Sequence, residues 1–131
     1  MIKITLNKIP KTAKLTKSDI ISIVNESLSV FNIDKQIVEI LFVDKSAIHK
    51  LNLEHRKIDK PTDVLSFPQT PINSSRYSIL GSIVINMDLV FEKEEDIVEV
   101  IKHGLLHILG YDHETDETTW NAAAQKINCT L

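Results

Sequence analysis

The sequence predicts an α+β (mixed α/β) fold, with an about four-stranded mixed sheet packed with four to five helices. Three observations support this fold class. The 131 residues match the usual length of one domain. Segments with the apolar patterns of strands are interleaved with segments of helical periodicity. No repeat, low-complexity tract or linker divides the chain, so we expect residues 1–131 to form a single domain.

The chain begins with a predicted strand and helix. Residues 2–6 (IKITL) alternate apolar and polar side chains, as a half-buried strand does. Thr16 and Asp19 have the spacing of a capping box, and apolar residues follow at helical intervals. We therefore expect a helix that ends near Phe31.

A second strand and helix follow. Residues 37–43 (IVEILFV) are β-branched and mostly apolar, which is typical of a buried strand. Asp44 is placed to cap a helix that ends near Arg56.

The central part of the chain predicts two strands separated by polar sequence. Residues 57–62 carry turn chemistry around a proline. Residues 64–67 form a short predicted strand, residues 69–78 a polar loop, and residues 82–86 another strand.

Two helices complete the prediction. One runs from about Lys93 to Leu109, and Gly110 then ends it as a left-handed residue. The other begins near Asp116 and carries Trp120, which we expect in the core.

Composition limits the class of protein. Hydrophobic residues make up 43% of the chain, and the single Cys129 excludes an internal disulfide and a Cys-rich zinc ribbon. No apolar run approaches the ~18 residues of a membrane span, and the N-terminus lacks the apolar region of a signal peptide. We therefore expect a cytoplasmic protein without a membrane partner.

Charge is distributed unevenly although the net charge is only -3. Residues 1–18 carry five lysines and no acid, whereas residues 88–117 carry ten acids and two lysines. Such a polarised chain can present a basic face to a polyanion. The alternative is a lysine-rich surface that only aids solubility, and charge alone does not decide between them.

The most informative segment is residues 103–113, HGLLHILGYDH. His103 and His107 lie one helical turn apart on one face, where two imidazoles can bind one cation. Gly110 permits the positive φ that lets the chain turn back and bring His113 as a third ligand. Without a cation, three imidazoles buried together would leave several nitrogens unpaired, at about 1–3 kcal/mol each. The alternative is a set of hydrogen-bonded core histidines.

The number of ligands bears on the role of the metal. Structural zinc sites usually have four protein ligands, whereas catalytic sites have three and leave one position to water. Asp112 or Glu114 could instead complete the set, although neighbours of His113 rarely share its ion. We favour Asp112 as an outer partner or a helix-end polar group.

The histidine spacing coincides with HExxHxxGxxH, the zincin-like metal helix of the metzincin proteases, at every position but one. The metzincins have a glutamate general base after the first histidine, where this chain has Gly104. Glycine has no group that takes a proton, so we do not expect a peptidase of that mechanism.

Four blocks of sequence resemble the YbeY family of bacterial endoribonucleases and ribosomal-RNA maturation factors. HGLLHILGYDH is similar to the family motif HGxLHLxGYDH. LNLEHR at residues 51–56, DKPTDVLSFP at 59–68 and LGSIVI at 80–85 look like further family blocks in the same order. Ser82 departs from the usual aspartate, so no role of that carboxylate is transferred. The connection from Ile85 to His103 is also short for the family.

The resemblance implies a metal site of His103, His107 and His113, with Arg56 as a nearby catalytic cation. Its guanidinium offers bidentate donors to phosphate and stays charged at any working pH. Without the resemblance, Arg56 would be taken for a surface residue at a helix end. His113 is assigned with Arg56 to catalysis, and the expected substrate contacts are Arg56, Ser66 and Lys102.

The resemblance further implies a metal-dependent endoribonuclease that prefers single strands and acts in rRNA maturation and ribosome quality control. Its expected partners are RNA, in particular rRNA or ribosomal subunits. Zn²⁺ is the expected cofactor, although three imidazoles also bind Ni²⁺ or another divalent transition metal. Two alternatives stay open: a non-catalytic ribosome-assembly factor with a structural metal, and a small metallopeptidase.

Overall fold

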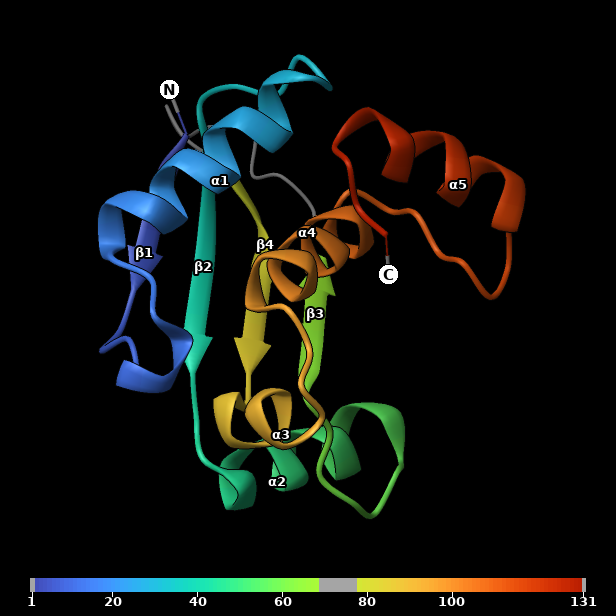
Figure 1. The fold of residues 1–131 in the computed structure, drawn as a ribbon. Helices are drawn as coiled ribbons and strands as arrows, with labels where there is room; N and C mark the ends of the chain where they lie inside the picture. Colours follow the sequence, from blue (N-terminus) through green and yellow to red (C-terminus); the bar gives the residue numbers. More distant parts are fainter. Residues whose placement is uncertain (1, 69–77, 131) are drawn as a thin grey trace.

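The computed structural model describes residues 2–68 and 78–130. In order, its elements are β1 (Lys3–Leu6), a 3-10 turn (Lys11–Ala13), α1 (Lys17–Ser29), β2 (Gln36–Phe42), α2 (Lys45–Arg56), β3 (Val64–Pro68), β4 (Ser78–Ile85), α3 (Met87–Glu92), α4 (Ile97–Ile108) and α5 (Glu117–Lys126). Strands and helices alternate from β1 to β3, and three helices follow β4 (Figure 1).

The described strands form one mixed sheet in the order β1-β2-β4-β3. β1, β2 and β4 are parallel, and α1 supplies the crossover that parallel β1 and β2 need. β3 pairs with β4 in antiparallel register, with Ser66 opposite Ile83. This topology places β3 at the edge of the sheet, beside α4. The predicted fold class, a mixed sheet of four strands with five helices, is confirmed.

Helices cover both faces of this sheet. α1 and α4 lie side by side over one face, where they bury the main core together with Val38, Ile40 and Ile83 (Figure 1). α2 packs on the opposite face, where Ile48 contacts Leu65 and Val84. Burial of each such aliphatic side chain contributes about 1.5–3 kcal/mol, so α4 is held firmly on the sheet.

The helix boundaries follow from their caps. Thr16 and Asp19 form the predicted capping box of α1, and Asp44 accepts the N–H of Ala47 at the start of α2. Asp116 caps α5 in the same way, through the N–H of Thr119. These predicted helix starts are confirmed.

Three parts of the prediction are wrong. The helix expected from Lys93 begins at Ile97, because the Asp96 carboxylate accepts the N–H of Val98 and caps it there. The short helix α3 was not predicted, since its six residues show little more than one helical turn of apolar periodicity. β4 starts at Ser78, earlier than the expected residue 82, so it includes the last residue of the loop predicted at residues 69–78. The rest of that loop lies outside the described residues. Within the described ranges, no helix has the length and apolar character that a membrane crossing requires.

Candidate metal centre

Helix α4 carries the first two histidines of the motif. Its apolar residues face the sheet and α1, and His103 and His107 lie one turn apart on the side that borders β3 and α5. Both rings are half-buried. A cavity of about 600 Å³ opens between them and β3.

The turn after α4 brings the third histidine to the first two. Gly110 has a φ of 100°, and its N–H donates to the carbonyl of His107 at 3.0 Å. The N–H of Tyr111 donates to Leu106 at 3.0 Å, which completes a glycine-terminated helix end. The chain then turns back along α4, so His113 faces the helix it has just left.

The three imidazoles converge as the spacing predicts. The Nε2 atoms of His103 and His107 are 3.1 Å apart, and one nitrogen of each of the three rings lies within 4.8 Å of the others. His113 is the exposed member of this set, which we call the histidine triad. Its ring centroid lies 5.3 Å from that of His103 and 5.5 Å from that of His107.

Trp120 forms an apolar floor beneath the triad. It is only 3% exposed, so its predicted core position is confirmed. Its ring lies 4.9 Å from His103 and 5.0 Å from both His107 and His113. α5 therefore restricts the rotation of all three imidazoles, a role that its sequence pattern did not reveal.

Burial keeps the two helical histidines uncharged. Loss of solvent, reinforced by the neighbouring imidazoles, lowers the pKa of His103 to about 4. The pKa of His107 is also lowered, first by burial and then by His113. Neutral imidazole is the form that binds a metal, so these two residues are available as ligands at neutral pH.

The donor set fits a transition metal such as zinc. Two nitrogens bound at about 2.1 Å in tetrahedral geometry lie about 3.4 Å apart, close to the 3.1 Å between His103 and His107. In addition, Nδ1 of His103 is buried without a hydrogen-bond partner. The other ring nitrogen, Nε2, is the one that faces His107 and is therefore the available ligand atom.

The two carboxylates beside His113 do not join the triad. Asp112 accepts the N–H of Glu114 at 2.9 Å through its side chain and the N–H of Asp116 through its carbonyl. This agrees with the prediction of a helix-end polar group. The triad therefore consists of three nitrogen donors.

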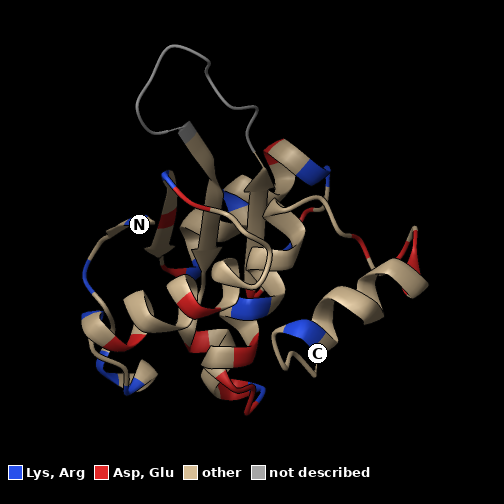
Figure 2. Ribbon diagram, turned by 90° about the horizontal axis from the view of Figure 1, so that it is seen from above, with Lys and Arg blue, Asp and Glu red and all other residues tan. Residues whose placement is uncertain are grey.

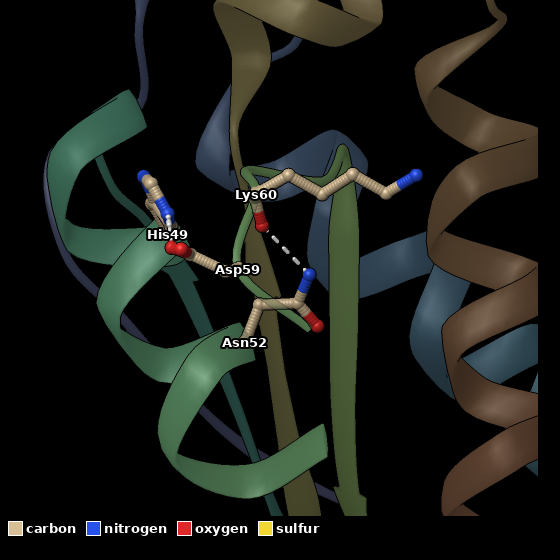
Figure 3. A network of polar contacts seen from close by, with 4 residues as sticks. All are labelled: His49, Asn52, Asp59 and Lys60. Atoms are coloured by element: carbon tan, nitrogen blue, oxygen red, sulfur yellow. Dashed lines mark hydrogen bonds and ion pairs between the residues drawn. The ribbon is translucent and has the colours of Figure 1, made fainter. Parts of the chain in front are cut away.

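Arg56 lies at the C-terminal end of α2, where it is exposed and borders the same cavity as the triad. The loop after it is fastened to α2 by two contacts (Figure 3). Asn52, which is buried, donates from Nδ2 to the carbonyl of Lys60 at 2.8 Å. His49 and Asp59 pair at 2.7 Å. These contacts hold the loop between Arg56 and β3 against α2.

The remaining predicted substrate residues differ in placement. Ser66 lines the cavity on β3, as expected of a substrate contact. Lys102 does not line it, and its ammonium instead lies 3.4 Å from the carbonyl of Asn128. The structure thus brings Arg56, Ser66 and the triad together and leaves Lys102 aside.

A pair of carboxyl groups beside the triad was missed by sequence reasoning. Asp63 and Glu95 hydrogen-bond through their side chains, and Lys93 lies 3.9 Å from Asp63. Burial, together with Asp63, raises the pKa of Glu95 to about 7. The pKa of Asp63 is lowered by its hydrogen bonds and by Lys93, which outweigh its burial. No local motif links residues so far apart in sequence.

Two positions that depart from related motifs have structural explanations. A Cβ on Gly104 would lie 2.9 Å from Ile83 Cγ2, so this position faces the sheet and leaves no space for a catalytic glutamate. Ser82 donates to Glu39 at 2.9 Å on the neighbouring strand and does not border the triad.

Comparison with known proteins identifies a family, named relatives and a similar solved structure. The family model described as Endoribonuclease YbeY matches residues 2–128. The Endoribonuclease YbeY of Sulfurihydrogenibium sp. is 35% identical over 88% of this chain and 81% of its own length. That of Campylobacter jejuni is 48% identical over 70% of this chain and 71% of its own. A solution structure from Thermotoga maritima matches with a TM-score of 0.53 at 25% identity, over 98% of this chain and 87% of that one.

Proposed function

The chain belongs to the YbeY family of endoribonucleases, and from this membership we propose that it cleaves single-stranded RNA at the histidine triad. Ribosomal RNA is the proposed substrate, and rRNA maturation and ribosome quality control in the cytoplasm are the proposed setting. The observation that carries the proposal is the position of Arg56 and the triad on one cavity of about 600 Å³. A cavity of this size admits a phosphodiester with its flanking sugars.

We propose that the triad holds one divalent transition metal, in the first instance Zn²⁺. Bound there, the ion would supply Lewis-acid polarisation of a phosphoryl oxygen. The charge of the cavity supports the need for a cation. Its wall carries Asp63, Asp112 and Glu114 against the single cation of Arg56 among its lining residues, so an anionic phosphate would otherwise be repelled.

Arg56 would bind the scissile phosphate. A guanidinium donates two parallel hydrogen bonds to phosphate oxygens and stabilises the charge that accumulates in the transition state. Ser66 on β3 lines the same cavity, and its hydroxyl would donate to the substrate. His113, the exposed member of the triad, is proposed with Arg56 as a catalytic residue. The Trp120 ring packs against all three imidazoles, so it would hold them in place around the ion.

The test combines metal analysis with RNA cleavage. Elemental analysis of purified protein should find about one zinc per chain, and His107→Ala should lose it together with activity on a single-stranded rRNA fragment. Arg56→Met should retain the metal and lose about 10²- to 10³-fold in kcat, the usual effect of removing one transition-state donor. Lys50→Met is the matched control, because it removes a cation from the same helix at an exposed position that does not line the cavity.

The same experiment separates the alternatives. Metal-loaded wild-type protein that binds ribosomal particles but leaves RNA intact would support an assembly factor with a structural metal. Cleavage that persists in His107→Ala and without metal would contradict the proposed site.

A further inference from the structure

A second cavity, of about 610 Å³, is also lined by His103 and His113 but not by Arg56. Its walls come from β3, the segment before α4, and α5, and they include Asp63, Glu95, His103 and Trp120. The proposed phosphate site gives this cavity no role. Nevertheless, the carboxylate residues Asp63 and Glu95 line this cavity together with His103 and His113 of the triad.

Two residues that line this cavity each carry a buried polar atom without a hydrogen-bond partner in the protein, Oε1 of Glu95 and Nδ1 of His103. They are complementary. When Nε2 of His103 binds a cation, the neutral ring carries its proton on Nδ1 and becomes a donor there. Oε1 of Glu95 is an acceptor. A buried donor or acceptor left unpaired costs about 1–3 kcal/mol, so a contact that satisfies both atoms at once is favoured.

Glu95 is held in place for such a contact. Its side chain hydrogen-bonds to Asp63, and its N–H donates to the carbonyl of Val90 at 3.0 Å. Asp63 is fixed in turn, because Oδ1 accepts the N–H of Val64 at 2.8 Å and Lys93 lies 3.9 Å from Oδ2. Both carboxylate oxygens of Asp63 thus already contact other groups of the protein, whereas Oε1 of Glu95 has no hydrogen-bond partner.

We propose that Glu95 is a positioning residue for His103, with its Oε1 accepting the proton of His103 Nδ1 through one water molecule in the second cavity. The inference rests on the proposed metal site. A bridging water needs two or more polar partners and space, and this cavity offers both. Metal-bound histidines almost always donate their second N–H to such a partner, which fixes the ring and keeps the other nitrogen free for the ion.

Three variants of the full chain test this inference. Glu95→Met removes the acceptor at nearly constant size, and Zn²⁺ affinity measured by chelator competition should fall about 10- to 100-fold. Glu95→Gln should retain wild-type affinity, because its amide donates to Asp63 while its oxygen replaces Oε1. Glu117→Met is the matched control, since Glu117 lines the same cavity but is exposed at the start of α5, and its affinity should not change.

A spectroscopic measurement on the zinc-loaded wild type needs no variant. Nitrogen-15 NMR should show His103 bound through Nε2, with a slowly exchanging proton on Nδ1 whose exchange quickens in Glu95→Met. Binding of zinc through Nδ1 would overturn the inference, and so would wild-type affinity in Glu95→Met or equal losses in Glu95→Met and Glu95→Gln. Failure of the wild type to bind zinc would instead overturn the metal site itself.

Discussion

Replacement of Gly104 by alanine tests whether α4 is seated on the sheet as closely as the structure shows. The added Cβ would lie 2.9, 3.1 and 3.2 Å from Cγ2, Cδ1 and Cγ1 of Ile83. Carbon atoms in favourable contact are separated by about 3.5–4.0 Å, so the methyl group is about 0.6 Å too close. Ile83 is fully buried in the main core, where side chains are close-packed, so it can move only by displacing its neighbours.

The expected net effect is a loss of stability. Excess volume in a packed core costs about 1–3 kcal/mol. Against this, alanine is more favourable than glycine in a helix interior by about 1 kcal/mol. We therefore expect Gly104→Ala to lower the free energy of unfolding by about 1 kcal/mol, whereas the same change on a solvent-facing side of the helix would raise it.

Urea unfolding of the metal-free protein measures the effect, with Ile83→Ala as the second member of a double-mutant cycle. Ile83→Ala removes all three atoms that the new Cβ would meet. In that background Gly104→Ala should become neutral or stabilising, which gives a coupling energy of about 1 kcal/mol or more. A stabilised Gly104→Ala single mutant, or a cycle without coupling, would show that the helix and strand are not in this close contact.

Three further predictions concern the surroundings of the triad. Because the raised pKa of Glu95 makes the folded state bind more protons than the unfolded state between pH 4.5 and about 7, stability should fall as pH rises through that window. Urea unfolding at pH 5 and pH 8 measures the difference in the free energy of unfolding between the two pH values. Glu95→Gln should reduce that difference by about 1 kcal/mol, a value that allows for solvent screening. Asn52→Ala, which releases the carbonyl of Lys60, should cost about 1–2 kcal/mol and lower kcat/KM for RNA without changing zinc affinity; weakened zinc binding would contradict this assignment. Zinc at 100 times its Kd should raise Tm by about 10 °C, and His107→Ala should abolish that rise in a thermal melt.

The sequence predicted the parts of the site that depend on local spacing. His103, Gly110 and His113 define one helix face and one turn, and the geometry of each is set by residues a few positions away. The helix caps at Thr16, Asp44 and Asp116 are local in the same sense, so the elements that carry the site were also predictable. Arg56 was identified only through the resemblance, because its distance from the triad depends on how α2 packs.

The parts that were missed depend on contacts between distant segments. Asp63 and Glu95 meet only because the start of β3 lies beside the segment that precedes α4. No local sequence pattern around either residue predicts this contact. Likewise, the contact of Trp120 with the triad depends on how α5 docks against α4. The apolar spacing around Trp120 predicted that its side chain is buried, but not which residues it packs against.

The glycines explain why the triad lies where it does. The chain has only three glycines: Gly81 lies against α4, Gly104 lies within it, and Gly110 follows its C-terminal end. A Cβ on Gly104 would meet Ile83, and a Cβ on Gly81 would lie 2.9 Å from Ile108 and 2.7 Å from the carbonyl of Phe67. The middle and the end of α4 can therefore approach β4 closely, and Gly110 then lets the chain turn back at the edge of the sheet. The same close approach brings the histidine face of α4 against β3, the strand that follows Arg56 and its loop. The position of the triad relative to Arg56 therefore depends on the absence of side chains at Gly81 and Gly104.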